Sequence, residues 1–151
     1  MKKKRMERKA IFAGTFDPYT RGHHSIAMRA LAMFDKIVIA IGHNSEKSAM
    51  STLEERIAAI SRLYAEEPRI EIAAYEGLTT DFAKAQQACC LLRGVRSVKD
   101  FEYERDLADI NREISGIETL IMVSEPQYAA ISSSVVRELM RYGKDVSKLL
   151  P

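Results

Sequence analysis

The sequence Gly-Thr-Phe-Asp-Pro-Tyr-Thr-Arg-Gly-His-His at residues 14–24 decides how the rest of the chain is expected to fold. It follows a short apolar run at residues 10–13 and precedes an amphipathic run at residues 25–34. That order predicts a first strand joined by a loop to a first helix. In an open α/β sheet, backbone N–H groups and the positive end of the helix dipole favour an anion at such a loop. The stretch therefore indicates a phosphate site.

Length and composition predict one folded domain. The chain has 151 residues, of which 46% are hydrophobic and 29% charged. No apolar run approaches the roughly 20 residues that a membrane span needs, and no signal peptide is apparent, so we expect a cytoplasmic protein without a membrane partner. Residues 1–8 are expected to be a basic, flexible segment ahead of a single domain at residues 9–151. Because the remainder is net negative, we expect no nucleic-acid partner for the domain.

The two cysteines, Cys89 and Cys90, are adjacent in an apolar context. Neighbouring cysteines are too close for an ordinary disulfide, and no further ligands lie at metal-binding spacing. Both cysteines are therefore predicted to lie in the core, and no metal site is expected on the protein.

Apolar runs alternate with amphipathic ones along the whole chain. This alternation predicts a Rossmann-like α/β fold, a doubly wound five-stranded parallel sheet with helices on both faces. The expected strands are residues 10–13, 36–42, 70–75, 88–93 and 119–123. The expected helices are residues 22–33, a stretch from the Thr52 capping box to before Pro68, and residues 80–87, 98–114 and 131–142, with a further turn at 146–150.

Polar side chains follow four of the five expected strands, and the carboxyl ends of parallel strands share one edge of the sheet. We therefore expect them to converge. Thr15 and His23 follow the first strand, although capping the helix is the alternative role. His24 is not among the expected site residues, because the spacing Thr-x-Gly-His at residues 20–23 points to His23. Lys47 follows the second strand, where a solvated surface charge is the alternative to a phosphate contact.

The fourth and fifth strands contribute arginines and serines. Burial of the Arg93 guanidinium needs an anionic partner, which is either a phosphate or a carboxylate of Glu102 or Glu104. Arg96 follows three residues later. Residues 132–134 are three serines at a predicted helix start, where they either cap the helix or bind phosphate, with Arg137 facing the same anion or the solvent.

These motifs resemble a known family. Gly-Thr-Phe-Asp-Pro followed by Thr-x-Gly-His resembles the nucleotidylyltransferase superfamily, and Arg-Gly-Val-Arg at residues 93–96, Asp-Phe-Glu-Tyr-Glu at 100–104 and Ile-Ser-Ser-Ser-Val-Val-Arg at 131–137 are similar to the phosphopantetheine adenylyltransferases within it. The resemblance implies transfer of the adenylyl group of ATP to 4′-phosphopantetheine, which gives dephospho-coenzyme A and pyrophosphate in coenzyme A biosynthesis. It also implies Mg²⁺ arriving with ATP, a homohexamer, and coenzyme A as a feedback inhibitor.

The resemblance assigns roles to matching positions. It implies catalytic roles for Thr15, His23, Lys47 and Arg93, and acceptor binding by Thr15, Lys47, Thr79 and Arg93. It implies ATP binding by Thr15, Phe16, His23, Gly94, Val95, Arg96, Glu104, Tyr128, Ala129, Ala130, Ile131, Ser132, Ser133 and Ser134. Because the acceptor phosphate is already anionic, we expect direct in-line attack without a covalent enzyme intermediate.

Three alternatives remain open from the sequence. A nicotinate-mononucleotide adenylyltransferase shares the opening loop, although the two arginines and the Phe-Glu-Tyr-Glu run argue against it. A nucleotide-sensing module would keep the ATP pocket and transfer nothing. Nucleic-acid binding through the basic residues 2–9 is compatible with catalysis and would be sensitive to salt.

Overall fold

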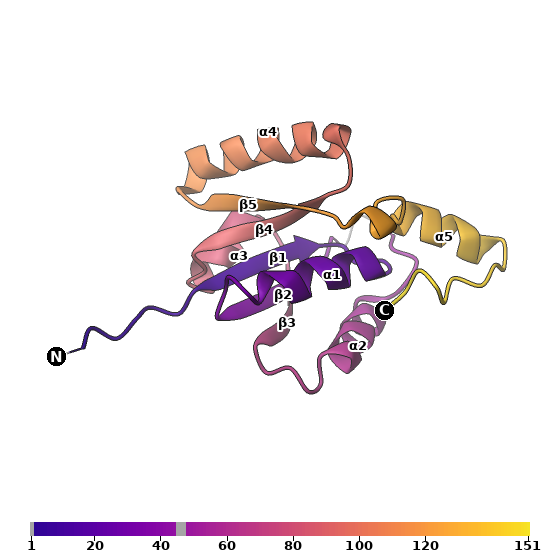
Figure 1. The fold of residues 1–151 in the computed structure, drawn as a ribbon, viewed down its shortest axis with the longest axis horizontal. Coiled ribbons are helices and arrows are strands. Elements are labelled where there is room, and N and C mark those ends of the chain that lie inside the picture. Colours follow the sequence, from indigo (N-terminus) through magenta and orange to yellow (C-terminus); the bar gives the residue numbers. More distant parts are fainter. Residues whose placement is uncertain (1, 45–47) are drawn as a thin grey trace.

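The computed structural model describes residues 2–44 and 48–151, and within these ranges five strands alternate with five α-helices and one short 3₁₀ helix (Figure 1). The elements are β1 (Lys9–Gly14), α1 (Arg21–Ala30), β2 (Lys36–Gly42), α2 (Leu53–Leu63), β3 (Ile70–Tyr75), α3 (Thr79–Ala85), β4 (Cys90–Val95), α4 (Val98–Ser115), β5 (Glu118–Val123), η1 (Pro126–Tyr128) and α5 (Ser133–Arg141).

All five strands are parallel, in the order β3-β2-β1-β4-β5. The chain winds outward from β1 through β2 to β3, and then crosses to the other side of β1 through α3 and β4. The order of the strands therefore reverses between β1 and β4, and in doubly wound sheets ligands bind at the carboxyl ends of the strands at such a point. The predicted parallel sheet is confirmed.

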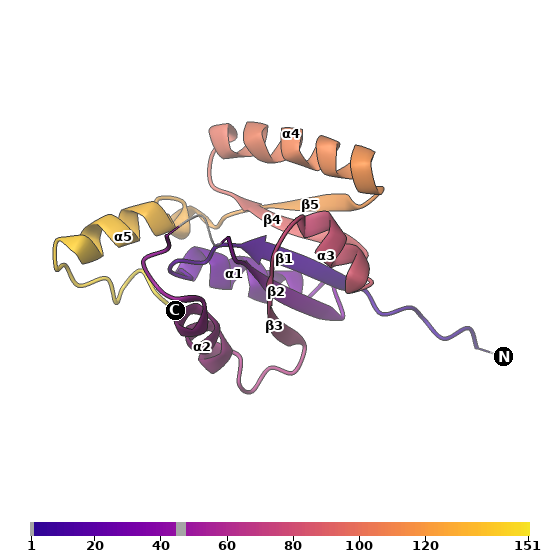
Figure 2. The same cartoon turned by 180° about the vertical axis from the view of Figure 1, so that it is seen from behind.

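Helices cover both faces of the sheet, as predicted. Figures 1 and 2 show α1 and α3 on opposite sides of it. On one face Phe12 and Ile39 pack with residues of α1 and α2, including Ile60. On the other face Ile11 and Val38 pack with α3. Because successive strand residues point to opposite faces, the apolar run of each central strand supplies both cores.

The fourth strand begins and ends two residues later than expected, so that Gly94 lies inside it. A Cβ atom on Gly94 would lie 3.1 Å from Cγ1 of Ile26, and the glycine therefore allows α1 to pack closely against β4. Cys89 precedes the strand and is exposed, whereas Cys90 is buried. The expectation that both cysteines lie in the core is wrong for Cys89, because only the strand is covered on both faces.

The helix-capping box predicted at Thr52 is present at the start of α2, where the Thr52 hydroxyl accepts from the backbone N–H of Glu55. The two ends of the described chain lie outside the helices and strands. Residues 146–150 form a turn, closed by a hydrogen bond from Leu149 N to the carbonyl oxygen of Val146. Residues 2–8 extend away from the sheet (Figure 1). None of the helices within the described ranges has the length and apolar character of a membrane span.

Candidate active site

Three hollows adjoin one another at the carboxyl edge of the sheet. The histidine cavity, 360 Å³, is lined by His23, Arg96 and the serines of α5, and the Glu104 cavity, 250 Å³, by Glu104, Thr79 and Asn111. The arginine cavity, 520 Å³, is lined by Arg56, Arg137 and Arg141. Thr15 lines all three, and Arg93 lines both the histidine and the Glu104 cavities. The hollows therefore meet where the strand order reverses between β1 and β4.

Two helix N-termini meet at the histidine cavity. Thr20, Gly22 and His23 at the start of α1 line one side, and Ser132–Ser134 at the start of α5 line another. Arg93, Arg96 and Arg137 line the same hollow. Because helix N-termini carry unpaired N–H groups and a partial positive charge, this cavity is suited to phosphate groups.

His23 is held as a neutral imidazole with its proton on Nε2. The backbone N–H of Thr20 donates to His23 Nδ1 at 2.9 Å, and because an amide N–H can only donate, Nδ1 carries no proton. The rings of Phe16 and Tyr19 pack on the imidazole with centroids 5.0 and 5.3 Å away. Burial, followed by the charges of Arg93 and Arg96, lowers the pKa of His23 to about 4. At neutral pH the ring therefore offers one N–H donor, at Nε2.

Arg93 is fixed at the boundary between two cavities. Its Nε and Nη2 donate to the two carboxylate oxygens of Glu104 at 2.8 and 2.7 Å, and its Nη1 donates to the carbonyl oxygen of Ala13 at 2.6 Å. The carboxylate partner that the sequence left as an alternative is thus observed. Burial opposes the charge, but the hydrogen bond and charge of Glu104 raise the pKa of Arg93. A guanidinium has five N–H groups, so it retains donors for an anion.

The Glu104 cavity combines a charged end with apolar walls. Leu91 and Leu107 line it, as does the amide of Asn111. The Thr79 hydroxyl also lines it and hydrogen-bonds to the Tyr75 hydroxyl at 2.7 Å. Such a cavity suits a narrow molecule that has an anionic end and an amide-containing body.

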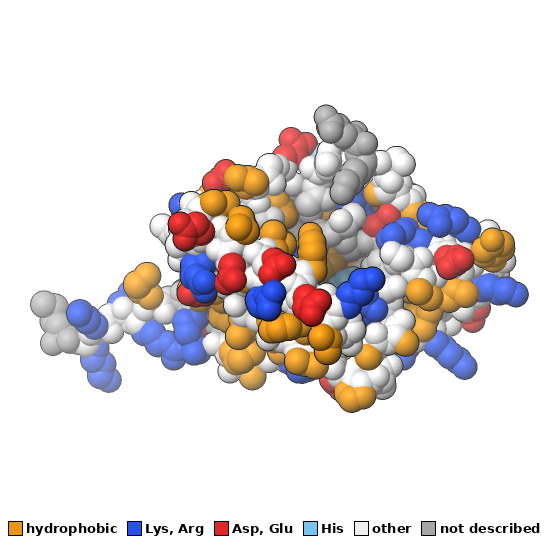
Figure 3. Space-filling model, turned by 90° about the horizontal axis from the view of Figure 1, so that it is seen from above, with side chains coloured by type: hydrophobic (Ala, Val, Ile, Leu, Met, Phe, Trp, Pro, Cys, Tyr) orange, Lys and Arg blue, Asp and Glu red, His pale blue; other side chains and the backbone are white. Residues whose placement is uncertain are grey.

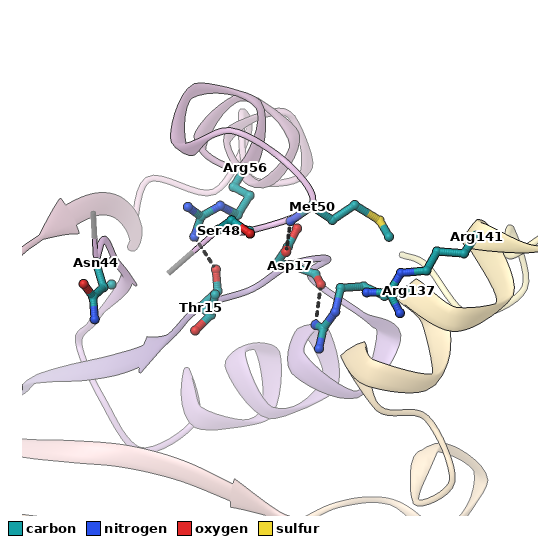
Figure 4. A pocket seen from close by; sticks show the side chains of 10 residues that line it. Thr15, Asp17, Asn44, Ser48, Met50, Arg56, Arg137 and Arg141 are labelled. Carbon is teal, nitrogen blue, oxygen red and sulfur yellow. Dashed lines mark hydrogen bonds between the residues drawn. The ribbon is translucent and has the colours of Figure 1, made fainter. Parts of the chain in front are cut away.

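The arginine cavity gathers cations around an already satisfied carboxylate (Figure 4). Both oxygens of the Asp17 carboxylate accept backbone N–H groups, from Met50 at 2.7 Å and Ser51 at 3.1 Å. Arg137 donates to the carbonyl oxygen of Asp17, and Arg56 to that of Thr15, each at 2.8 Å. Among residues 2–44 and 48–151, none is a hydrogen-bond partner of the buried Nε of Arg56. This hollow is therefore suited to a second polyanionic group.

The serine hydroxyls at the start of α5 all have partners within the protein. Ser132 caps the helix by accepting from Val135 N, and Ser133 donates to the carbonyl oxygen of Pro18 at 2.9 Å. Ser134 accepts from Nη2 of Arg137 at 3.1 Å. The capping alternative is confirmed for Ser132. Phosphate binding by this helix start stays a prediction.

Most residues that the sequence assigned to ATP line one hollow, and some do not. Lining the histidine cavity are Thr15, Phe16, His23, Gly94, Arg96, Ile131, Ser132, Ser133 and Ser134. Val95 is buried in the core instead, and Glu104 lines the neighbouring cavity. Not among the lining residues are Tyr128, Ala129 and Ala130, although the Ala129 carbonyl oxygen accepts from Arg96 at 3.4 Å. Lys47 lies outside the described residues.

Sequence reasoning did not single out four lining residues, Asp17, Arg56, Asn111 and Arg141. Asp17 belongs to the quoted loop, which was the available signal, but its role in holding residues 50 and 51 is visible only in three dimensions. Arg56 and Asn111 lie inside amphipathic helices, where a charged or amide side chain normally faces solvent.

The residues at the site do not form a metal site of their own. The carboxylates of Asp17 and Glu104 are engaged by backbone N–H groups and by Arg93. In the part of the chain that the structure describes, no three His, Cys, Asp or Glu side chains are grouped so that they could hold an ion.

Comparisons with known proteins point to one family. The cytidylyltransferase-like family model matches residues 11–139. Phosphopantetheine adenylyltransferases of Phocaeicola vulgatus and Bacteroides fragilis are 50% and 48% identical over 144 residues, which is 95% of this chain and 95% and 96% of theirs. That of Flavobacterium johnsoniae is 47% identical over 95% of both chains.

A solved structure shares the fold at much lower identity. The lipopolysaccharide core biosynthesis protein of Thermoplasma volcanium superimposes with a TM-score of 0.57 at 18% identity, covering 80% of this chain and 98% of that one. At this identity the likeness concerns the fold alone. The family-model match and the close sequence relatives lead to one assignment: the chain belongs to the phosphopantetheine adenylyltransferase family of cytidylyltransferase-like enzymes.

Proposed function

We propose that the protein transfers the adenylyl group of ATP to 4′-phosphopantetheine. A phosphate oxygen of the acceptor attacks the α-phosphorus of ATP in line, the bond from that phosphorus to the β-bridging oxygen breaks, and pyrophosphate leaves with its electron pair. The product is dephospho-coenzyme A. No covalent enzyme intermediate forms.

The observation that carries this proposal is the position of Thr15 and Arg93 between the hollows. The adenylyl end of ATP occupies the histidine cavity, and its β- and γ-phosphates extend toward the arginine cavity. The pantetheine arm occupies the Glu104 cavity, with its phosphate at the shared boundary. In this arrangement the acceptor oxygen approaches the α-phosphorus from one cavity and pyrophosphate departs toward another, which supports in-line displacement.

The donors at this junction match the charge that develops during transfer. His23 donates through Nε2, and the Thr15 hydroxyl donates beside it, to the α-phosphate oxygens. The free N–H groups of Arg93, together with Lys47, hold the acceptor phosphate against electrostatic repulsion. Arg137 and the start of α5 hold the departing pyrophosphate. Because the acceptor is an anion at neutral pH, the reaction needs no general base.

The proposal includes two further ligands, Mg²⁺ and coenzyme A. Mg²⁺ would arrive with ATP, and it would supply neutralisation of charge on the polyphosphate. Coenzyme A has both a nucleotide and a pantetheine arm, so it competes for the histidine and Glu104 cavities as a feedback inhibitor.

We also propose that the protein self-associates, as the homohexamer that the resemblance implies. Large apolar side chains are exposed on α4 and the adjoining edge strand, among them Phe101 at 43%, Ile110 at 60%, Ile114 at 57% and Val123 at 68%. Figure 3, seen from the side of α4, shows hydrophobic side chains interleaved with charged ones of both signs. A surface of this kind is typical of a contact between copies of a chain.

The test is pyrophosphate release from ATP with 4′-phosphopantetheine, compared with nicotinate mononucleotide, and the reverse formation of ATP from dephospho-coenzyme A and pyrophosphate. We expect turnover in both directions with the pantetheine pair only. Preference for nicotinate mononucleotide would favour the related adenylyltransferase, and ATP binding without turnover of either acceptor would favour a sensing module.

A further inference from the structure

A chain of three hydrogen-bonding side chains lies behind His23, outside the three hollows. The hydroxyls of Tyr19 and Tyr64 are 2.7 Å apart, and the Tyr64 hydroxyl is 2.8 Å from Nδ1 of His24. Tyr19 and Tyr64 are each only 5% exposed. The hydrogen bonds of Tyr19, Tyr64 and His24 thus join the loop before α1, the end of α2 and the first turn of α1.

The direction of the hydrogen bonds follows from satisfying both buried hydroxyl protons. If the Tyr19 O–H donates to Tyr64, then the Tyr64 O–H donates to Nδ1 of His24, and each proton has an acceptor. The opposite direction would leave the Tyr19 proton without an acceptor among the residues that the structure describes. Burial lowers the pKa of His24, which favours the neutral imidazole that accepts in this chain.

The first member of the chain packs against the imidazole at the site. The rings of Tyr19 and His23 are stacked, with centroids 5.3 Å apart and planes at 28°. The Tyr19 ring also contacts the edge of Phe16, whose ring packs on His23 at 86°. His23 is therefore held by its bond from Thr20 at Nδ1 and by ring contacts on its faces and edges.

We propose that Tyr19 is a positioning residue for His23, with Tyr64 and His24 fixing the Tyr19 ring through their hydrogen bonds. The chain aligns the plane of the His23 ring, so that Nε2 keeps its direction toward the transferred phosphate. The role in turnover rests on the proposed adenylyl transfer. The alignment of His23 is a property of the protein itself and is measured without turnover.

The kinetic test distinguishes the effect of the Tyr19 ring on kcat from the effect of the hydrogen-bonded hydroxyls. Tyr19→Leu removes the stacked ring, and we expect kcat to fall about 10-fold, with the KM for ATP changed less than about 2-fold. Tyr19→Phe keeps the ring and should retain most of kcat. Tyr64→Phe leaves a buried Tyr19 hydroxyl proton without its acceptor. The double variant Tyr19→Phe/Tyr64→Phe removes both hydroxyls, so neither is left unpaired. We therefore expect a lower kcat for Tyr64→Phe than for the double variant.

The second readout is the ¹⁵N NMR signature of the His23 imidazole in the unliganded protein. The wild type should show the Nε2–H tautomer, because the backbone N–H of Thr20 donates to Nδ1. In Tyr19→Leu the unstacked imidazole should turn out of line with this N–H, so the spectrum should show a mixture of tautomers. Tyr142→Leu is the control, because Tyr142 is 76% exposed and lies at the C-terminal end of α5. Should Tyr19→Leu fail to fold, the comparison of Tyr64→Phe with the double variant decides.

An unchanged kcat and an unchanged His23 tautomer in Tyr19→Leu would overturn the proposal, as would a double variant no faster than Tyr64→Phe. A wild-type protein without activity toward 4′-phosphopantetheine would contradict the proposed function instead. In that case the His23 tautomer still tests the alignment by Tyr19.

Discussion

Arg93 and Glu104 form a two-pronged ion pair that joins β4 to α4 where the histidine and Glu104 cavities meet. The Glu104 side chain is 8% exposed and the Arg93 side chain 30%. Because Glu104 occupies Nε and one N–H of Nη2, the guanidinium has one fixed plane. The remaining donors of Arg93 are therefore oriented before any anion binds.

Glu104→Gln should weaken acceptor binding. The neutral amide keeps the size of the side chain but loses the charge that fixes Arg93, so we expect the KM for 4′-phosphopantetheine to rise about 10-fold with little change in the KM for ATP. Steady-state kinetics with each substrate varied checks this. Glu102→Gln, on the exposed side of the same helix, is the matched control. A rise confined to the KM for ATP would support the nucleotide role that the resemblance implies for Glu104.

His23→Ala should lower kcat by about 10²- to 10³-fold, because removal of one donor to a developing oxyanion costs this much in other enzymes. The KM for ATP should change only a few-fold, since the donor acts most strongly in the transition state. Single-turnover measurements distinguish the two effects. His43→Ala serves as a control, because His43 is paired with Glu76 beyond the histidine cavity. Equal turnover of His23→Ala and the wild type would remove His23 from the catalytic role.

The lowered pKa of His23 predicts a pH dependence of stability. The imidazole has a pKa of about 4 in the folded protein and 6.5 when unperturbed. Between these values the unfolded chain binds a proton that the folded chain does not, so the free energy of unfolding falls as the pH drops through this window. The loss is at most about 3 kcal/mol, and less because the ring is partly exposed.

Denaturant unfolding of the wild type and of His23→Gln, from about pH 7 to about pH 4.5, checks this dependence. The unfolding free energy of the wild type minus that of His23→Gln should decrease as the pH falls, because only the wild type carries His23. His24 titrates in the same direction and is present in both proteins, so it cancels from the difference. A constant difference across the range would mean that His23 is protonated as easily in the folded as in the unfolded chain.

The sequence predicted the alternation of elements and the edge of the sheet where the site lies, because buried parallel strands are continuous apolar runs. The start of β4 was misplaced because Ala88 and Cys89 are apolar and small, and apolarity alone does not show where pairing begins. The cations Arg56 and Arg141 were missed for a different reason. Arg56 and Arg141 come close to the loop at residues 14–24 only because α2 and α5 pack near it. A local sequence pattern does not predict such a contact.

Ile110→Glu should weaken self-association. Ile110 is 60% exposed on α4, and a carboxylate in an apolar contact between copies would be buried without a partner. Sedimentation velocity should show a smaller species for the variant than for the wild type at the same concentration. Lys148→Glu, on the exposed C-terminal segment, is the control for the change in charge. A wild type that sediments as a monomer would contradict the proposed hexamer directly.

The stereochemical course at phosphorus distinguishes direct transfer from a two-step reaction. With one diastereomer of ATP carrying sulfur on the α-phosphate, a single in-line displacement inverts the configuration at phosphorus, whereas a covalent adenylyl-enzyme gives two inversions and net retention. We expect inversion, because the cavities for acceptor and polyphosphate meet at Thr15 and allow the two substrates to be bound together. Analysis of the dephospho-coenzyme A thiophosphate product by ³¹P NMR gives the configuration. Net retention would mean that a protein side chain attacks first, and would contradict the proposed mechanism while leaving the overall reaction intact.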